Sequence, residues 1–513
     1  MNASISLLVA AAVVLPAVVG AASVLMLRHR LDASRLVSLG ACLALVGIAA
    51  ALVVHASGGT TESYALGNWR APFGIVLVLD RLSAMMLLLT AGLATVVMTY
   101  AVATGMDRKG WHFHPLFQFQ LLGLNGAFLT GDLFNLFVFF EVLLIASYGL
   151  LLHGQGPMRL KAGVQYVVIN LVGSTLFLIG VGLLYGVTGT LNMADLAVKV
   201  AAAPAGDQGL IAASALILTV VFALKAAVVP LHFWLPGAYS AATGAVAALF
   251  AIMTKVGAYA IIRTSTLIFG EDAGAAAFVA GPWLLPAAIA TTFIGFIGLF
   301  AARGLREMAA WSVIGSMGML LSAISVFRVE AMGPALYYVL HSTLAGAALF
   351  LVADLIGKRR GEHGDALTLG PRFRQSGLLS GLFFLTAIGV VGLPPLSGFI
   401  GKLLILDGVR ETPAAAWIWG TILITTLIGV LAFARAGSLL FWKSAEVEGE
   451  IPTRALRGRV VGVAAAGGLL AALALLTVLA GPVTAYTAAA AEQLFEPRAY
   501  IEAVLGETSG GRR

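Results

Sequence analysis

The sequence predicts an all-α membrane protein, built as a single transmembrane domain of about fourteen helices over residues 1–513. Hydrophobic residues make up 60% of the chain and charged residues only 11%, against roughly 25% charged in a soluble domain. Mean hydropathy is +0.98, and apolar runs of about twenty residues recur from one end to the other. This composition excludes a soluble enzyme.

Each predicted span is an apolar run long enough to cross about 30 Å of hydrocarbon as a helix. The first, 3–27, has no basic segment before it and is as long as the later spans, so we expect a retained helix rather than a cleaved signal. Segment 190–207 is expected to be an amphipathic surface piece. The spans are, in order, 3–27, 36–56, 75–103, 115–131, 133–153, 164–188, 210–229, 238–266, 283–302, 308–327, 334–357, 377–409, 415–442 and 460–487.

Basic residues are distributed unevenly between alternate loops. One set of loops holds about twice as many Lys and Arg residues as the other, and Arg263 is assigned to the sparser set. By the positive-inside rule, the richer set faces the cytoplasm. The sequence therefore predicts a multi-pass protein of the bacterial cell membrane with an even number of spans and both termini outside the cytoplasm.

Two of the spans carry internal breaks. The seventh runs into Val229–Pro230 and continues through Pro236, and the twelfth is interrupted at Gly392–Pro395. Proline removes a backbone donor and kinks a helix, and such a break survives in a membrane only where it lines protein or water. The breaks lie five spans apart, which predicts two inverted five-helix repeats. The repeats are 115–266 and 283–442, and the flanking helices occupy 1–103 and 460–487.

Four ionisable residues lie within predicted spans: Glu141, Lys225, Lys255 and Lys402. Each costs about 2.5–3.5 kcal/mol at mid-membrane depth on insertion scales, so each needs a reason. Burial disfavours the charged form of both carboxylates and ammonium groups, which makes these groups able to exchange protons. A row of such groups on adjacent helices can act as a relay. The alternatives are snorkelling of a single lysine and a structural ion pair between Glu141 and Lys225.

Two histidines are further candidates. His341 lies in the centre of the eleventh span, where an imidazole can accept on one nitrogen and donate on the other. It is either a relay member between the eighth and twelfth spans or a hydrogen-bonded core histidine. His232 lies at the first break, where it either orients the bend or marks a helix end at the surface.

Other polar residues are expected to be structural. Asp80 and Arg81 open the third span and are expected to face the lipid headgroups, and Asp132 is expected to start a helix. Asp354 can pair with Lys358 at i, i+4. Arg435 falls within the thirteenth span and is expected to be buried, with a partner that the sequence does not identify.

No cofactor or metal is predicted. The chain has no phosphate-binding loop, no dinucleotide fingerprint and no cluster of residues at metal-ligand spacing. Its one cysteine, Cys42, excludes a disulfide framework and a CxxC metal or iron–sulfur site. The net charge of +7 comes from short loops between spans, so no nucleic acid partner is predicted.

Three segments of the chain resemble a known family. They are TGDLFNLFVFFEVLLIASY around Glu141, ALKAAVVPLHFWLPGAY around Lys225, and GLPPLSGFIGK ending at Lys402. They resemble the proton-translocating family shared by Mrp-type monovalent cation/proton antiporters and respiratory complex I, and in detail the D subunits of Mrp antiporters. The resemblance implies that Glu141, Lys225, Lys255, His341 and Lys402 are the proton-carrying residues. Lysine at 402 argues against the complex I subunit that carries glutamate there.

The resemblance implies a proton-translocating subunit of a multisubunit antiporter that exchanges Na+ or another monovalent cation for protons. It would work in the lipid bilayer with other membrane subunits of the Mrp complex, as a secondary transporter and not an enzyme. One alternative is a proton-pumping subunit of a respiratory NADH–quinone oxidoreductase or membrane hydrogenase. Another is a scaffold that carries no protons, in which neutralising all the buried charges would leave transport intact.

Overall fold

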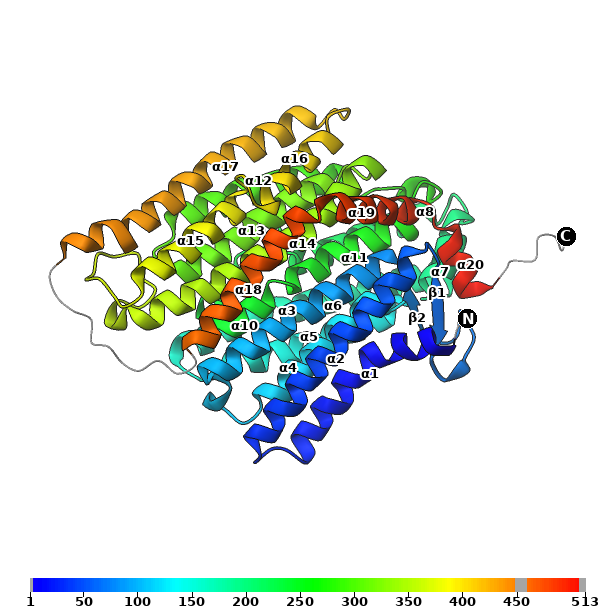
Figure 1. The fold of residues 1–513 in the computed structure, drawn as a ribbon. Coiled ribbons are helices and arrows are strands. Elements are labelled where there is room, and N and C mark those ends of the chain that lie inside the picture. The colour runs from blue at the N-terminus through cyan, green and yellow to red at the C-terminus, as the bar shows by residue number, and fades with distance from the viewer. Residues whose placement is uncertain (1–2, 448–458, 507–513) are drawn as a thin grey trace.

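The computed structural model describes residues 3–447 and 459–506. Figure 1 shows a bundle of long helices that lie roughly side by side, with a short β-hairpin at one end. Both described ends of the chain lie at this end, and the hydroxyl of Ser63 in the hairpin donates to the carbonyl of Ala503 (2.5 Å). We call it the hairpin end. The opposite end, which carries loops 105–112 and 360–375, is called the loop end.

Most helices of the N-terminal half run from one end of the bundle to the other. In chain order they are α1 (Ala3–Leu25), α2 (Leu31–Ser57), β1 (Glu62–Ala65), η1 (Leu66–Asn68), β2 (Val76–Leu79), α3 (Arg81–Thr104), η2 (Met106–Lys109), α4 (Phe113–Leu129), α5 (Leu133–Leu152), α6 (Pro157–Thr188), α7 (Met193–Ala201), α8 (Gln208–Lys225), α9 (Trp234–Ala241), α10 (Gly244–Phe250) and α11 (Met253–Leu267).

The C-terminal half continues the bundle. Its elements are η3 (Gly274–Ala276), α12 (Gly281–Ala301), α13 (Leu305–Ile324), α14 (Val329–Arg359), η4 (Gly361–His363), α15 (Ser376–Val391), α16 (Ser397–Gly408), α17 (Ala415–Gly437), the π-helical η5 (Ser438–Trp442), η6 (Lys443–Glu446), α18 (Arg459–Val478), α19 (Ala480–Phe495) and α20 (Arg498–Leu505).

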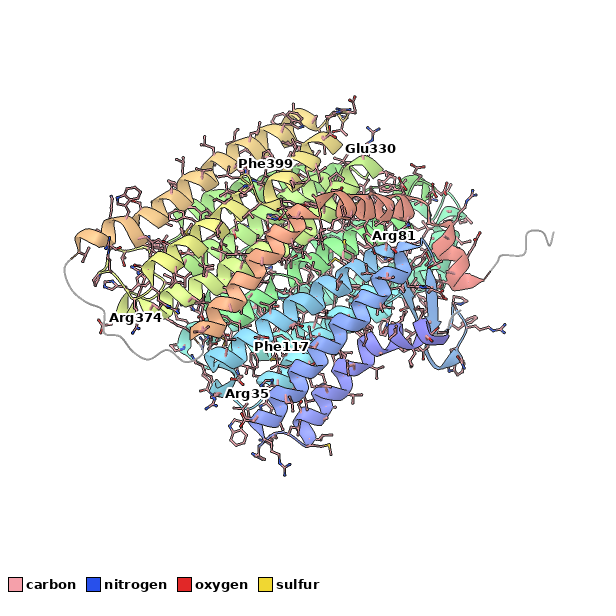
Figure 2. The ribbon with its side chains drawn as sticks, viewed as in Figure 1. Arg35, Arg81, Phe117, Glu330, Arg374 and Phe399 are labelled. Carbon is pink, nitrogen blue, oxygen red and sulfur yellow. The ribbon has the colours of Figure 1, made fainter. Side chains whose placement is uncertain are left out.

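The predicted membrane architecture is confirmed. Twelve helical segments in the described part of the chain are long and apolar enough to cross a membrane. The two other predicted spans coincide with α4, which has 17 residues, and with the broken pair α15 and α16. Charged side chains gather at the two ends of the bundle. Arg35 and Arg374 lie at the loop end and Arg81 and Glu330 at the hairpin end in Figure 2, as a hydrocarbon layer between the ends requires.

Three predicted spans differ from the helices observed. Residues Val76–Leu79 of the third span form β2, which pairs with β1 in antiparallel register with Glu62 opposite Leu79. The eighth span is divided between α10 and α11, although no proline marks the division. The last span ends at Val478, because Pro482 has no N–H to donate to the Val478 carbonyl and α19 takes a new direction.

Segment 190–207 contains the amphipathic helix α7, as predicted. Asn192 caps it by accepting hydrogen bonds from the backbone N–H groups of Ala194 and Asp195 (3.1 and 3.2 Å). Leu196 and Val200 are buried, whereas Lys199 pairs with Asp195. The helix therefore covers the hairpin end with its apolar face inward.

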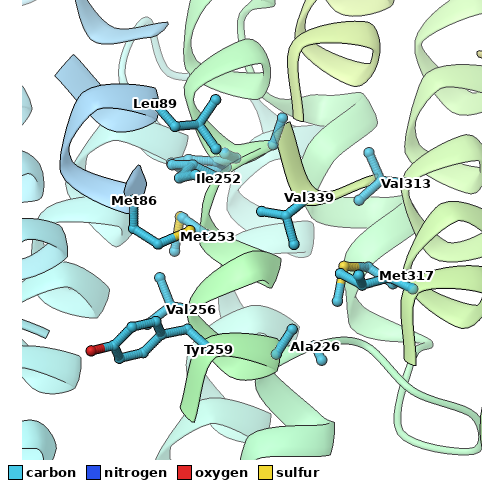
Figure 3. Close-up of a cluster of buried hydrophobic side chains, with 14 of the residues drawn as sticks. Met86, Leu89, Ala226, Ile252, Met253, Val256, Tyr259, Val313, Met317 and Val339 are labelled. Atoms are coloured by element: carbon cyan, nitrogen blue, oxygen red, sulfur yellow. The ribbon is translucent and has the colours of Figure 1, made fainter. Parts of the chain in front are cut away.

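Apolar side chains surround α11 in the middle of the bundle (Figure 3). They come from α3, α11, α13 and α14, together with Ala226 just after α8, and are buried: Met86, Met253, Val256, Val313, Met317 and Val339 are among them. Ionisable groups on α11 and its neighbours are therefore separated from bulk water by a packed core.

Candidate functional site

Four of the five predicted relay residues are buried in the interior. Lys225 is 8% exposed, Lys255 1%, His341 1% and Lys402 5%. Glu141 on α5 is partly buried. The interior of this membrane protein therefore holds three amines and an imidazole where isolated charges are costly.

The first break positions Lys225. It is the last residue of α8, and the chain resumes as a helix only at Trp234. The backbone groups that the break releases have partners: the indole N–H of Trp234 donates to the carbonyl of Leu224 (3.2 Å), and the N–H of Val229 donates to the hydroxyl of Thr291 on α12 (2.9 Å). The break is therefore satisfied inside the protein, as a break at membrane depth must be.

Two polar side chains of α6 link Lys225 to Glu141. The ammonium of Lys225 donates to Oδ1 of Asn170 (3.0 Å), and one turn further on the hydroxyl of Ser174 donates to the carboxylate of Glu141. No ion pair within 4.0 Å joins Glu141 to Lys225, although the two interact electrostatically. The two groups are therefore not in direct contact, and Asn170 and Ser174 lie along the path between them.

Small cavities lie beside two of the buried groups. One of about 20 Å³ is lined by Lys225, Asn170, Tyr166, Trp234 and Met253 among others. Since one water needs about 10–15 Å³, this cavity has room for about one. A second cavity, of about 10 Å³ and lined in part by His341, is at the lower limit for a water.

Lys255 lies three residues after the division between α10 and α11. Its ammonium is buried and has no hydrogen-bond partner among the described residues. Nearby, α11 packs closely against the end of α8. A Cβ at Gly257 would collide with the carbonyl of Phe222 and the N–H of Ala226. Burying a charged amine without a partner costs free energy, unless the amine gives up or exchanges its proton.

His341 lies between the two lysines of the C-terminal side. Its Nδ1 is 2.9 Å from the hydroxyl of Ser397, at the start of α16. A side chain at Gly398 would collide with the imidazole, so the second break brings backbone against the ring. The charges of Lys402 and Lys255 both act on His341. The structure thus brings Lys255, His341 and Lys402 within electrostatic reach of one another.

Lys402 is held by the second break. Its ammonium donates to the carbonyl of Val391, at the end of α15 (2.6 Å), and to the hydroxyl of Thr426 on α17 (2.7 Å). Gly392 has φ +76°, and a Cβ there would lie 2.8 Å from the Lys402 side chain. Glycine is therefore needed both for the left-handed backbone and for the close approach of the lysine.

Comparisons with known proteins place the chain in a family. The model of the NADH:quinone oxidoreductase/Mrp antiporter transmembrane family matches residues 130–429. The D subunit of a probable K+/H+ antiporter from Rhizobium meliloti is 44% identical over 476 residues, 87% of each chain. The D subunit of the Na+/H+ antiporter from Alkalihalophilus pseudofirmus is 37% identical over 507 residues, 96% of this chain and 98% of the relative. The chain belongs to the Mrp antiporter D-subunit family.

The solved Mrp complex of Dietzia sp. DQ12-45-1b contains a similar chain. It has 29% sequence identity and a TM-score of 0.87 over 99% of this chain and 100% of that one. The predicted family is confirmed, and this Mrp D-type chain is a transporter subunit rather than an enzyme.

Two predictions for this Mrp D-type chain are wrong at the hairpin end. Asp80 does not face the headgroups: it is 2% exposed, caps α3 in a capping box with Ser83, and forms a bidentate ion pair with Arg263 (2.6 and 2.9 Å). Arg263 is therefore not a loop residue but a buried residue of α11, 3% exposed. Arg81 is only partly buried and binds backbone carbonyls of Ser57 and Ala489.

The contacts of three other polar residues can be compared with the predictions from the sequence. Asp132 caps α5 by accepting from the N–H of Asn135 (2.8 Å), as predicted. Lys358 pairs with Asp354 (2.6 Å), also as predicted. Arg435 is exposed rather than buried, and donates to the carbonyl of Ala302 at the end of α12 (2.9 Å).

His232 lies at the first break, and its ring packs near that of Trp311 with 5.8 Å between the centroids. Among the described residues no group of three or more His, Cys, Asp or Glu side chains is arranged to hold a metal ion.

The neutral partners of the buried charges are not among the residues predicted from the sequence. Asn170 and Ser174 contact Lys225 and Glu141, and Ser397 and Thr426 contact His341 and Lys402. A signal for the first pair exists, because an amide and a hydroxyl four residues apart in a span lie on one helix face. The second pair lies on different helices and carries no such signal.

Proposed function

We propose that this chain carries protons across the membrane through Glu141, Lys225, Lys255, His341 and Lys402. Side chains of α6 bind Glu141 and Lys225 at one end of this row, and the Val391 carbonyl and the Thr426 hydroxyl bind Lys402 at the other. The middle member, Lys255, connects them. A proton gained or lost at one group changes the charge felt by the next, which is how coupled sites pass a charge along.

The observation that carries the proposal is the buried, unpartnered ammonium of Lys255. A lysine kept for stability would be hydrogen-bonded or paired, because an orphaned amine in an apolar core is destabilising. A lysine that exchanges protons needs a neutral form at low cost and a neighbour to receive the charge. His341, on which its charge acts, is that neighbour.

We further propose that residues 115–266 and 283–442 are two inverted repeats. Each contains one broken span with a buried lysine beside the break, Lys225 in the first and Lys402 in the second. In both, the amine binds an oxygen supplied by the protein. This similarity supports a common role for the two breaks.

Na+ or K+ is the proposed counter-ion, exchanged for protons by this chain together with other membrane subunits of an Mrp complex. Support comes from the names of the relatives, which are D subunits of a probable K+/H+ antiporter and of a Na+/H+ antiporter. Those relatives also favour the antiporter over a redox-driven pump.

We propose that the loop end faces the cytoplasm of a bacterial cell and both termini lie outside it. The excess of basic residues in one set of loops supports this orientation, as does the common position of the two described chain ends (Figure 1).

The test uses inside-out vesicles that contain this subunit with its native partners, in a host without its own cation/proton antiporters. A preformed proton gradient is followed while Na+ or K+ is added. We expect the cation to collapse the gradient with the wild type and with Glu330→Gln, an exposed glutamate at the hairpin end, but not with Glu141→Gln. Assembly of each complex is verified by co-purification.

Collapse by Glu141→Gln at the wild-type rate would refute a role for this carboxylate. If assembled wild-type complex responds to neither cation, the redox-driven pump becomes the better explanation, and co-purification of iron–sulfur subunits would identify it.

A further inference from the structure

A polar cavity of about 260 Å³ lies at the loop end, between the ends of α3, α6, α13 and α14 and the start of α10. It is much larger than the 10–15 Å³ or so that one water requires. None of the proposed relay residues lines it. Its charged lining consists of four cations and two carboxylates: Lys109, Arg159, Arg306, Lys358, Asp354 and Asp365.

Both carboxylates already have partners. Asp354 pairs with Lys358 (2.6 Å) and also accepts from the hydroxyl of Tyr100 (2.6 Å). Asp365 pairs with Arg306 (2.8 Å) and accepts from the backbone N–H of the same residue (3.2 Å). Two of the four cations are thereby neutralised within the cavity wall.

The other two cations, Lys109 and Arg159, form no ion pair with a carboxylate of the described residues. Arg159 donates only to the neutral carbonyls of Ala241 and Gln155 (2.9 and 2.8 Å), and Lys109 forms no ion pair or hydrogen bond with the described residues. Burial, followed by the charges of Arg159 and Lys358, lowers the pKa of Lys109. The cavity therefore carries a positive excess that its own wall does not balance.

A buried hydroxyl also points to a missing ligand. Thr243 lines the cavity, is 4% exposed, and its Oγ1 has no hydrogen-bond partner among the described residues. A buried hydroxyl without a partner costs free energy, so a ligand acceptor here would stabilise the site.

We propose that this cavity binds a phosphate-type oxyanion, held by Lys109, Arg159 and the hydroxyl of Thr243. A phosphate presents several acceptor oxygens and a negative charge, which match an ammonium, a guanidinium and a hydroxyl donor. A cation would meet the positive excess. The anion is inorganic phosphate or the phosphate of an anionic phospholipid, and the experiment separates these sources.

The experiment measures the thermal stability of the purified, assembled complex. Inorganic phosphate is added at constant ionic strength, balanced with chloride. We expect a saturable rise in melting temperature for the wild type, an apparent affinity about tenfold weaker for Lys109→Gln, and near wild-type affinity for Arg108→Gln. Arg108 is the matched control, because it is the adjacent basic residue and does not line this cavity.

A second arm uses lipid. The delipidated complex is returned to vesicles of phosphatidylcholine with or without phosphatidylglycerol. Stabilisation by phosphatidylglycerol alone, lost in Lys109→Gln and kept in Lys109→Arg, identifies a phospholipid headgroup. Stabilisation by inorganic phosphate with the same variant pattern identifies a free anion.

Thr243→Val keeps the size of the side chain and removes the hydroxyl, so it tests the site even if Lys109→Gln fails to assemble. We expect it to weaken binding as well. The proposal is overturned if neither phosphate nor phosphatidylglycerol stabilises the wild type, or if Lys109→Gln, Thr243→Val and Arg108→Gln all bind alike.

Discussion

Replacing Asp80 with alanine is expected to destabilise the hairpin end severely. The carboxylate is buried and makes two contacts with the guanidinium of Arg263, 2.6 and 2.9 Å long. It also caps α3 by accepting from the N–H of Ser83 (2.8 Å). The substitution therefore removes a helix cap and leaves a buried guanidinium without its counter-charge.

The magnitude follows from the two losses. A lost cap costs about 1 kcal/mol. Breaking a buried ion pair by removing one partner costs about 3–5 kcal/mol, because the remaining charge is uncompensated. Asp80→Ala should therefore lower the free energy of unfolding by about 4–6 kcal/mol. The matched control is Asp32→Ala, since the side chain of Asp32 is 93% exposed and its pair with Arg35 contributes about 0–1 kcal/mol.

Cys42 supplies the assay. It is the one cysteine of the chain and is buried. A thiol reagent added to the purified complex therefore labels this chain when its packing opens. The labelling, read on the separated subunit as temperature rises, should have a much lower midpoint in Asp80→Ala than in Asp32→Ala.

The double variant Asp80→Leu with Arg263→Met tests the reasoning. Removing both charges together leaves no unpaired buried charge, so the double variant should be more stable than Asp80→Ala. A midpoint for Asp80→Ala equal to that of Asp32→Ala, or a double variant less stable than Asp80→Ala, would refute the account of this ion pair.

Three further outcomes are expected. Gly392→Ala should lower the free energy of unfolding by about 1–2 kcal/mol, because alanine disfavours the left-handed backbone at this position. Its Cβ should also displace Lys402 and thereby abolish cation/proton exchange in vesicles. The control Gly381→Ala places its Cβ in open space and should leave exchange unchanged. Ser174→Ala removes the donor to the α5 glutamate and should slow exchange about tenfold, with Thr175→Ala as the unaffected neighbour. Burial raises the pKa of Asp107, but hydrogen bonds from a neighbouring histidine and arginine outweigh it and lower the pKa from 3.8 to about 2. Asp107→Asn should therefore reduce thermal stability by about 2 kcal/mol at pH 7. Because the folded-state pKa is depressed, that difference should persist above pH 4 and close as the pH falls toward 2.

The membrane architecture could be predicted because it depends on features of the local sequence. Apolar runs mark the spans, and prolines mark the breaks after Lys225 and before Lys402. The division between α10 and α11 has no such mark. The strand β2 carries no signal of its own in the sequence, because its four residues are apolar and adjoin an apolar span.

The buried charges could be predicted for a similar reason, since an ionisable residue within a span is conspicuous. Of their partners, only Asn170 and Ser174 carry a signal, because their spacing places them on one helix face. Ser397 and Thr426 lie on different helices and carry none. The pair between Asp80 and Arg263 joins residues 183 positions apart, and a charge near the end of a span looks like a loop residue until its partner is known.

The most direct test of the relay is proton flux through a complex in which Lys255 is neutral. The purified complex is reconstituted in liposomes, a Na+ or K+ gradient is applied, and internal pH is followed for wild type, Lys255→Gln and the exposed control Lys199→Gln. The proposed relay requires Lys255→Gln to lower the cation-driven proton flux about a hundredfold or more, while Lys199→Gln stays within about twofold of wild type. Wild-type flux from assembled Lys255→Gln complex would contradict it.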